Sequence, residues 1–173
     1  MNSEIKNKAK SIKAILCDVD GVLTDGGIIY DSNLLEYKKF NVKDGQIVKY
    51  LHDNQFILGI ITGRNSPIVV HRCNELKIQF HRHGVKNKLK EYKKFKKQYN
   101  LKNKEIAYIG DDIIDMEVLS KCGLSIAPFD AVDSIKNNVD YITKKKGGQG
   151  VFREASEIIL KAQNILKSFN KEK

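Results

Sequence analysis

Cysteine is scarce in this chain of 173 residues, and the three cysteines lie far apart. Cys17, Cys73 and Cys122 are odd in number, and none belongs to a CxxC pair. Small disulfide-stapled domains carry even numbers of closely spaced cysteines, so the sequence excludes a disulfide framework. Unpaired thiols are typical of a reducing compartment, and we therefore expect a cytoplasmic protein.

Long apolar runs and linker-like segments are also missing. The longest apolar stretch, Ile57–Ile61, is far shorter than the roughly 18–20 residues that cross a bilayer, so we expect no membrane partner. The first residues, MNSEIKNKAKS, lack the apolar segment of a secretory signal. There are only 2 prolines and no repeat or low-complexity block. At this length, we expect residues 1–173 to form one domain.

Acidic residues are outnumbered by basic ones. The chain has 31 Lys and Arg residues against 21 Asp and Glu, which gives a net charge of +10 and a pI near 9.4. Nucleic-acid binding, a site for small phosphorylated acids and a lysine-rich composition bias would each produce this balance. With 41% hydrophobic and 30% charged residues, the composition is that of a globular protein and excludes disordered and fibrous classes.

Short apolar runs alternate with helical patterns along the chain. The runs predict strands at 12–17, 56–61, 105–109, 124–127 and 141–142. Apolar residues at i, i+3 and i+4 predict helices over 47–51, 68–76, 89–99 and 116–119, and a last helix follows Gly150 within the C-terminal segment 150–173. This alternation predicts an α/β fold with a central parallel sheet flanked by helices. Gly26–Phe40 departs from the pattern, because two short β-prone pieces predict a hairpin there.

Carboxylates follow the first and third predicted strands, at the sheet edge where ligands bind in such folds. Asp18 and Asp20 follow the first strand, and Asp111, Asp112 and Asp115 follow the third. Acids that converge on one pocket repel each other unless a cation is bound, and oxygen ligands without cysteine or a histidine pair favour Mg²⁺. Taken alone, the Asp-x-Asp pattern is equally compatible with a solvated turn.

A pattern suited to phosphate follows the second predicted strand. Thr62-Gly63-Arg64 combines a hydroxyl, a flexible glycine and a bidentate cation, which together can hold a phosphoryl group. The next pair, Ser66-Pro67, is typical of a helix start, and both interpretations are compatible because a helix N-terminus favours anions. Lys88 lies at a predicted loop-to-helix junction and can offset negative charge at the same sheet edge.

In this order, the motifs resemble those of phosphatases of the haloacid dehalogenase superfamily. The match comprises Asp18-x-Asp20-Gly21-Val22-x-Thr24, Thr62-Gly63-Arg64, Lys88 and Gly110-Asp111-Asp112-x-x-Asp115. The resemblance implies a Rossmann-like core and hydrolysis of a phosphomonoester through an aspartyl-phosphate, with Mg²⁺ as cofactor.

The resemblance also implies a role for each motif residue. Asp18 would be the nucleophile and Asp20 the general acid and then the general base, while Thr62 and Lys88 would hold the phosphoryl oxygens. The implied Mg²⁺ ligands are Asp18, the backbone carbonyl of Asp20 and Asp111, with Asp112 and Asp115 as supporting carboxylates.

A closer resemblance is to phosphatases of 3-deoxy-D-manno-octulosonate (KDO) 8-phosphate and of nine-carbon nonulosonate 9-phosphates. It rests on Asp25-Gly26, Lys39–Gly45, Thr62–Pro67, Arg72 and Gly147–Glu154. It implies conversion of KDO 8-phosphate to KDO and phosphate, a step toward lipopolysaccharide precursors. The alternative within this class is a nonulosonate 9-phosphate, although Arg64 favours the eight-carbon substrate because an acidic residue is common there in the nine-carbon relatives.

The same resemblance implies a set of substrate contacts rich in cations and polar backbone. The set is Asp20, Asn41, Val42, Lys43, Asp44, Gly45, Lys49, Arg64, Arg72 and Lys88. Cations suit the carboxylate of an acidic sugar. Ile47 and Gln149 depart from the residues common in many relatives, which bears on the shape of the pocket and on contacts of the C-terminal tail.

The motif spacing leaves no room for a separate cap domain. Asp20 and Thr62 are 42 residues apart, and Thr62 and Lys88 are 26 residues apart. Core elements and the hairpin at 26–40 consume these gaps, whereas a domain needs at least about 50 residues. An uncovered site would be open to water. We therefore expect a neighbouring subunit to supply the lid, and the resemblance implies a homotetramer.

Two further features favour simpler interpretations. His81 and His83 share one strand face, but no third histidine or cysteine is close in sequence, and we interpret them as surface or loop residues rather than a zinc site. Residues 86–97 carry seven lysines, but Leu89, Tyr92, Phe95 and Tyr99 form a core stripe that leaves the lysines on a solvated face. A basic nucleic-acid-binding module on an inactive phosphatase fold is the second hypothesis, and the intact acids argue against it.

Overall fold

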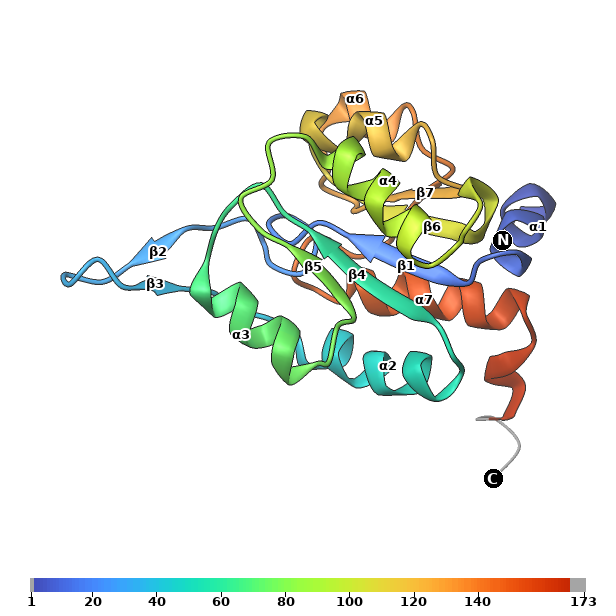
Figure 1. Ribbon diagram of the computed structural model, residues 1–173, viewed down its shortest axis with the longest axis horizontal. Helices are drawn as coiled ribbons and strands as arrows, with labels where there is room; N and C mark the ends of the chain where they lie inside the picture. The colour runs from blue at the N-terminus through green and yellow to red at the C-terminus, as the bar shows by residue number, and fades with distance from the viewer. Residues whose placement is uncertain (1, 169–173) are drawn as a thin grey trace.

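A six-stranded parallel sheet forms the centre of the molecule, as the computed structural model shows (Figure 1). The structure describes residues 2–168. The strands are β1 (Ala14–Cys17), β4 (Ile57–Ile61), β5 (Phe80–Arg82), β6 (Ile106–Ile109), β7 (Leu124–Ala127) and β8 (Tyr141–Ile142), in the order β5-β4-β1-β6-β7-β8. All five pairings are parallel, which confirms the predicted sheet. Strand β5 was not among the strands predicted from apolar runs, because its sequence, Phe-His-Arg, has none; only the shared strand face of His81 and His83 indicated an extended segment there.

Helices cover both faces of this sheet. One face carries α2 (Val42–Asp53), α3 (Pro67–Glu75) and α7 (Val151–Ala162), and the other carries α4 (Lys88–Gln98), α5 (Met116–Leu119) and α6 (Asp133–Lys136) (Figure 1). The first helix, α1 (Ser3–Lys10), was not predicted and packs against α7. Short 3-10 helices lie at Asn103–Glu105, Ile113–Asp115 and Ile165–Ser168.

Alternate residues of the central strand supply the two hydrophobic cores. Ile15 and Cys17 belong to the core beneath α2, α3 and α7, whereas Ala14 and Leu16 belong to the core beneath α4 and α5. Since all four side chains are buried, both sheet faces are covered, as an all-parallel sheet requires. Such a sheet offers its ligands one place, the edge beyond the carboxyl ends of the strands.

The predicted hairpin projects from this edge. Strands β2 (Ile29–Tyr30) and β3 (Glu36–Tyr37) pair antiparallel and extend away from the sheet (Figure 1). The carboxylate of Asp31 fixes the turn, because its Oδ1 accepts hydrogen bonds from the backbone N–H groups of Asn33 and Leu35, both at 2.9 Å. The hairpin predicted for 26–40 is therefore confirmed.

Helix α7 confirms the helix expected after Gly150, while residues 169–173 of the predicted segment 150–173 lie outside the described residues. Within residues 2–168, no helix combines the length and the apolar character needed to cross a bilayer.

Candidate active site

Asp18 is the first residue after β1 and is almost completely buried, with 6% of its surface exposed. Its Oδ1 accepts a hydrogen bond from the backbone N–H of Val19 at 2.7 Å, and its Oδ2 lies 2.6 Å from the Lys88 ammonium. Burial raises the pKa of Asp18 to about 6, against the opposing effect of Lys88. The carboxylate is thus fixed in direction at the sheet edge, as a nucleophile requires.

Lys88 links this carboxylate to a second one. It is the first residue of α4, where the Asn87 side chain caps the helix by accepting from the N–H of Lys90. Its ammonium lies 2.7 Å from Asp115 Oδ1, and only 2% of Lys88 is exposed. Burial alone would lower the pKa of Lys88, but the two carboxylates raise it, so the lysine is charged. A buried cation between two buried anions stabilises the arrangement only because every partner is present.

Asp115 is held by more than the lysine. The Tyr108 hydroxyl, on β6, donates to Asp115 Oδ1 at 2.5 Å. Asp115 Oδ2 accepts weaker bonds from the backbone N–H groups of Asp111 and Asp112, at 3.4 and 3.5 Å. Asp115 itself is fully buried. Both of its oxygens accept hydrogen bonds. Asp115 therefore orients Lys88 and the loop that follows β6.

Asp111 carries the clearest sign of a cation-binding site. Its Oδ1 is buried and has no hydrogen-bond partner, and burial, together with Asp18 and Asp115, raises the pKa of Asp111 to about 7. Oxygens of Asp18, Asp111 and Asp115 lie within 4.8 Å of one another. Gly21, at φ +82°, keeps this space open, since a Cβ there would lie 2.0 Å from Asp111 Oδ2.

This donor set fits a hard divalent cation. The ligand atoms are carboxylate oxygens, which Mg²⁺ prefers, and the orphaned oxygen of Asp111 needs a positive partner. Asp112 lies outside the cluster, because it is exposed and its Oδ1 accepts from the N–H of Ile113. The residues that could hold the ion are therefore Asp18 and Asp111, with Asp115 behind them.

Asp20 lies on the open side of the site, near the hairpin. It forms an ion pair with Lys38, whose side chain is completely buried, and its Oδ1 accepts from the Thr24 hydroxyl at 3.4 Å. The Nε atom of Arg64 lies 3.7 Å from Asp20 Oδ2, an oxygen without a hydrogen-bond partner. The side chain of Asp20 is 21% exposed, so it can exchange a proton with a bound molecule.

The loop after β4 brings Thr62 and Arg64 to the same edge. Thr62 is buried, and its carbonyl accepts from the N–H of Val85 at 3.0 Å, which joins this loop to the segment leading to Lys88. Ser66 is the N-cap of α3 by position, with Pro67 as the first helical residue, as predicted. Its hydroxyl does not cap the helix, however, but donates to Glu36 of the hairpin at 2.5 Å.

Most of the predicted substrate contacts are not gathered around Asp18. Asn41 caps α2 and donates to the Gly148 carbonyl at 3.2 Å, while Asp44 Oδ1 accepts from the N–H of Arg153 at 2.7 Å. Val42, Lys43 and Lys49 are exposed on α2. Among residues 2–168, no hydrogen bond or ion pair of this group reaches Asp18, Asp20 or Lys88.

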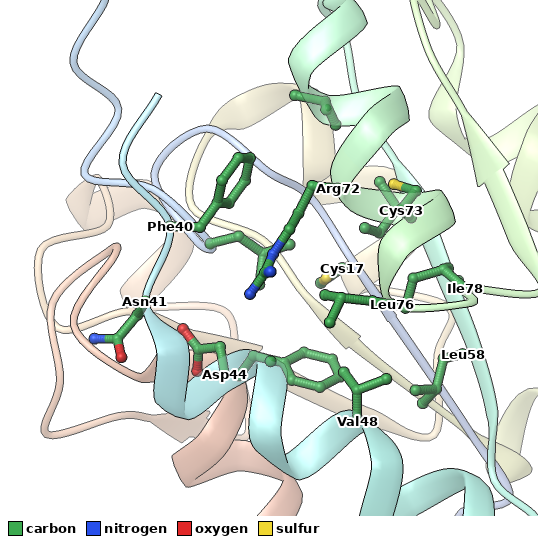
Figure 2. A pocket seen from close by; sticks show the side chains of 16 residues that line it. Cys17, Phe40, Asn41, Asp44, Val48, Leu58, Arg72, Cys73, Leu76 and Ile78 are labelled. Carbon is green, nitrogen blue, oxygen red and sulfur yellow. The ribbon is translucent and has the colours of Figure 1, made fainter. Parts of the chain in front are cut away.

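Asp44, Gly45 and Arg72 line a small cavity between α2 and α3. Figure 2 shows Arg72 reaching from α3 toward Asp44, beside the ring of Phe40. The cavity has a volume of about 30 Å³, enough for a water molecule or two but not for a sugar acid. A Cβ at Gly45 would lie 2.5 Å from the Arg72 guanidinium, so this glycine permits the close approach.

Three residues of the site were missed in the sequence. Lys38 pairs with Asp20, Glu36 accepts from Arg64 at 2.9 Å, and Tyr108 donates to Asp115. Glu36 and Lys38 alternate with Tyr37, so strand periodicity places them on one face of the hairpin. The alternation of Glu36 and Lys38 could therefore have been recognised in the sequence. The partner of the Tyr108 hydroxyl could not, because it depends on how α4 and β6 pack.

Known proteins resemble this chain over nearly its whole length. A family model described as haloacid dehalogenase-like hydrolase matches residues 82–154. The 3-deoxy-D-manno-octulosonate 8-phosphate phosphatase KdsC of Haemophilus influenzae is 40% identical over 92% of this chain and 88% of that protein. KdsC of Escherichia coli BL21 is 37% identical over 96% of this chain and 88% of that protein.

Solved structures agree with these relatives. The Yersinia pestis 3-deoxy-D-manno-octulosonate 8-phosphate phosphatase superposes with a TM-score of 0.95 at 36% identity, covering 96% of this chain and 90% of that one. The Moraxella catarrhalis enzyme, solved with magnesium, phosphate and KDO, superposes with a TM-score of 0.94 at 41% identity, covering 98% and 97%. This chain therefore belongs to the haloacid dehalogenase-like hydrolases, within the family of 3-deoxy-D-manno-octulosonate 8-phosphate phosphatases.

Proposed function

We propose that this protein is a Mg²⁺-dependent phosphomonoesterase that hydrolyses KDO 8-phosphate to KDO and phosphate. The observation that carries the proposal is the buried Asp18 carboxylate at the end of β1, fixed by Lys88 beside the unpartnered oxygen of Asp111. The relatives named above add the substrate. The Moraxella catarrhalis structure, at 41% identity, holds the metal, the phosphate and the sugar acid together.

We assign the first step to Asp18 and Asp20. An oxygen of Asp18 attacks phosphorus in line, and the bond from phosphorus to the sugar oxygen breaks, which forms an aspartyl-phosphate. Asp20 gives its proton to the departing sugar oxygen, so free KDO leaves. The unpartnered Oδ2 of Asp20 is the atom available for this transfer.

In the second step the roles of Asp20 reverse. Its carboxylate takes a proton from a water molecule, whose oxygen attacks phosphorus and breaks the bond to Asp18. Phosphate leaves and Asp18 is free again. In both steps Thr62, after β4, and Lys88, the first residue of α4, would hold phosphoryl oxygens. A Mg²⁺ ion held by Asp18, the Asp20 carbonyl and Asp111 would screen the repulsion between the two anionic reactants.

Arg64 is our candidate for the carboxylate of the sugar acid. It is half-buried and shared between Asp20 and Glu36 at the foot of the hairpin, so a substrate anion can compete for it. Arginine offers two parallel hydrogen bonds to a carboxylate.

We further propose that residues 1–173 are one domain and that its hairpin closes the site of a neighbouring copy in a homotetramer. The hairpin exposes apolar side chains that a monomer would leave in water: Ile28, Ile29, Tyr30, Leu34, Leu35 and Tyr37, each 51–80% exposed. In such an assembly, Lys43 and Lys49 on α2, with Asn41 and Val42, would act from the surface around the site rather than inside it. Asp44, Gly45 and Arg72, which line the small cavity between α2 and α3, would support these contacts from behind. The three thiols are free, which supports a cytoplasmic location.

The substrate is tested by phosphate release from a panel of sugar phosphates at saturating Mg²⁺. We expect kcat/KM for KDO 8-phosphate to exceed that for a nonulosonate 9-phosphate and for glucose 6-phosphate by at least about tenfold. Equal values across the panel would contradict the proposal. Filter binding of nucleic acid at two salt concentrations tests the second hypothesis, a nucleic-acid-binding module. Only that hypothesis predicts tight binding that weakens steeply as the salt concentration rises.

The assembly is tested with Leu34→Asp and Leu35→Asp at the tip of the hairpin. We expect light scattering to report smaller particles for these variants and kcat/KM to fall, because the lid is lost. A wild-type chain that is monomeric and fully active would exclude the shared lid.

A further inference from the structure

Cys73, His81 and His83 form a cluster that lies apart from the acidic site. Cys73 is on α3, while His81 is on β5 and His83 follows that strand. The Cys73 sulfur and one ring nitrogen of each histidine lie within 4.8 Å of one another. The spacing in sequence showed only the two histidines; both are half-buried, His83 lies in the loop after β5, and the structure adds the buried Cys73 beside them.

The geometry of the fold explains why these side chains meet. His81 pairs in register with Ile60, whose side chain belongs to the core beneath α3, and His83 shares the face of His81 by strand periodicity. Cys73 is one of two buried residues of α3, the other being Val69. Figure 2 shows Cys73 on α3 at the side of the cavity that Arg72 enters.

The two ring nitrogens that face each other in the cluster are Nδ1 of His81 and Nε2 of His83, which share one hydrogen bond at 2.8 Å. Desolvation by burial lowers the pKa of both imidazoles, with Arg82 acting in the same direction, so the rings are neutral and offer lone pairs. Burial raises the pKa of Cys73 to about 12, so a metal that takes its sulfur displaces a proton.

We propose that Cys73, His81 and His83 bind a transition-metal ion of the Zn²⁺ class. Two imidazole nitrogens and one thiolate are the soft and borderline ligands that zinc and its neighbours prefer, and Mg²⁺ does not compete for them. Tetrahedral coordination with metal–nitrogen bonds of about 2.0–2.1 Å separates two ligand nitrogens by roughly 3.3 Å. The 2.8 Å pair therefore has to open by only about half an ångström.

When the metal binds, each new bond to it replaces a bond that exists in the metal-free cluster. The Cys73 thiol gives its proton to solvent as the sulfur–metal bond forms. The imidazole that donates the hydrogen bond between the two rings shifts that proton to its other ring nitrogen by exchange with solvent, so Nδ1 of His81 and Nε2 of His83 each offer a lone pair, and two nitrogen–metal bonds replace the hydrogen bond. A water molecule fills the fourth position. No oxidant or reductant is needed.

The ion would fasten an edge of the sheet that is otherwise thinly held. Strand β5 has three residues and pairs only with β4 among the described strands. The metal would join β5 to α3, and the segment after His83 bonds to the Thr62 loop before it reaches Lys88. We therefore assign the site a structural role, independent of the chemistry proposed for Asp18.

The test is a Co²⁺ titration of the full chain, with Mg²⁺ in excess and a thiol-free reductant. We expect a thiolate-to-cobalt charge-transfer band that saturates at one equivalent and that Zn²⁺ abolishes. Zn²⁺ at 100 times its Kd should raise Tm by about 5–10 °C. Failure of the band to appear at saturating Co²⁺ would overturn the proposal.

Variants assign the ligands. Cys73→Ser should remove the band, and His81→Gln and His83→Gln should each weaken Co²⁺ binding at least about tenfold. The matched controls are His71→Gln, an exposed histidine on α3, and Cys122→Ser, a thiol on another segment, and both should keep the band. A band that survives in Cys73→Ser or in both cluster histidine variants would overturn the assignment. Because the histidines are half-buried, their variants carry the test even where Cys73→Ser loses its fold.

Discussion

Two buried carboxylates of this protein have opposite surroundings. Asp18, at the end of β1, has a lysine at 2.6 Å and a backbone donor at 2.7 Å, and Lys88 in turn holds Asp115. Asp44, between α2 and α3, has one backbone donor at 2.7 Å, and its Oδ2 has no partner. Burial raises the pKa of both to about 6.

The two carboxylates differ in how the free-energy cost of their burial is offset. Around Asp18, further buried charges are assembled, so the cost of desolvation is offset by a network that fails as a whole when one member is removed. Around Asp44, one hydrogen bond from the N–H of Arg153 and the charges of Arg153 and Arg72 oppose desolvation. Among residues 2–168, however, no cation forms an ion pair with this carboxylate, and the Arg72 guanidinium bonds to Glu75 at 2.8 Å. The first region is organised for chemistry, and the second is a local strain that a neutral side chain would relieve.

The largest effect is expected for Asp18→Asn. The amide oxygen can still accept from Val19, so the fold is kept, but an amide is not a nucleophile, and kcat should fall by at least about 10³–10⁴-fold. Phosphate release at saturating Mg²⁺ measures the loss, and circular dichroism checks the fold. Turnover above a tenth of the wild-type rate would exclude Asp18 as nucleophile.

Removing the Lys88 ammonium, which Asp18 and Asp115 share, should lower stability as well as activity. In Lys88→Met, two buried carboxylates lose their partner, and we expect the free energy of unfolding to fall by about 3–5 kcal/mol in metal-free buffer. Urea unfolding measures this. Lys90→Met, an exposed lysine on the same helix, is the control and should change stability by less than about 0.5 kcal/mol. Equal effects of the two substitutions would mean that the network contributes nothing.

A smaller loss is expected when the network is trimmed at its far end. Tyr108→Phe removes the hydroxyl that donates to Asp115, a bond to a charged group worth about 1.5–3 kcal/mol, while Lys88 remains. We expect a destabilisation of about 2 kcal/mol in urea unfolding and a modest fall in kcat with KM unchanged. If Tyr108→Phe and Lys88→Met destabilise additively when combined, the hydroxyl and the lysine do not act through the same carboxylate.

An effect of the opposite sign is expected for Asp44→Asn. The folded-state pKa of Asp44 is about 6 against an ordinary 3.8, so the unfolded chain ionises first as pH rises and wild-type stability is lost between about pH 4 and pH 6. The neutral amide keeps the acceptor for Arg153 and avoids this loss. Asp44→Asn should therefore gain about 2–3 kcal/mol over wild type at pH 8 relative to pH 4, by urea unfolding at both pH values. A gain that shrinks as pH rises would falsify the assignment.

Much of the fold could be predicted because its signals are local. The apolar runs before Asp18, Thr62 and Gly110 became β1, β4 and β6, and the hairpin at 26–40 formed where its turn residues stand. Strand β5 escaped prediction from apolar runs because its three residues have none, and β5 forms only because β4 offers it an edge. Local pattern identifies strands that carry their own hydrophobic surface, but not those that depend on a neighbour.

The sequence by itself determined which chemical groups stand at the strand ends, Asp18, Asp20, Thr62 and Asp111, and which one begins α4, Lys88. Only the tertiary structure decided which partner each of these groups contacts. It turned Asp115 toward Lys88 and Tyr108 while leaving Asp112 in solvent, brought Lys38 from the hairpin to Asp20, and carried Cys73 to two histidines on β5. The reason is physical: the type of a side chain is a property of its own position, whereas its partner is set by how helices pack on a sheet, across separations that no local period records.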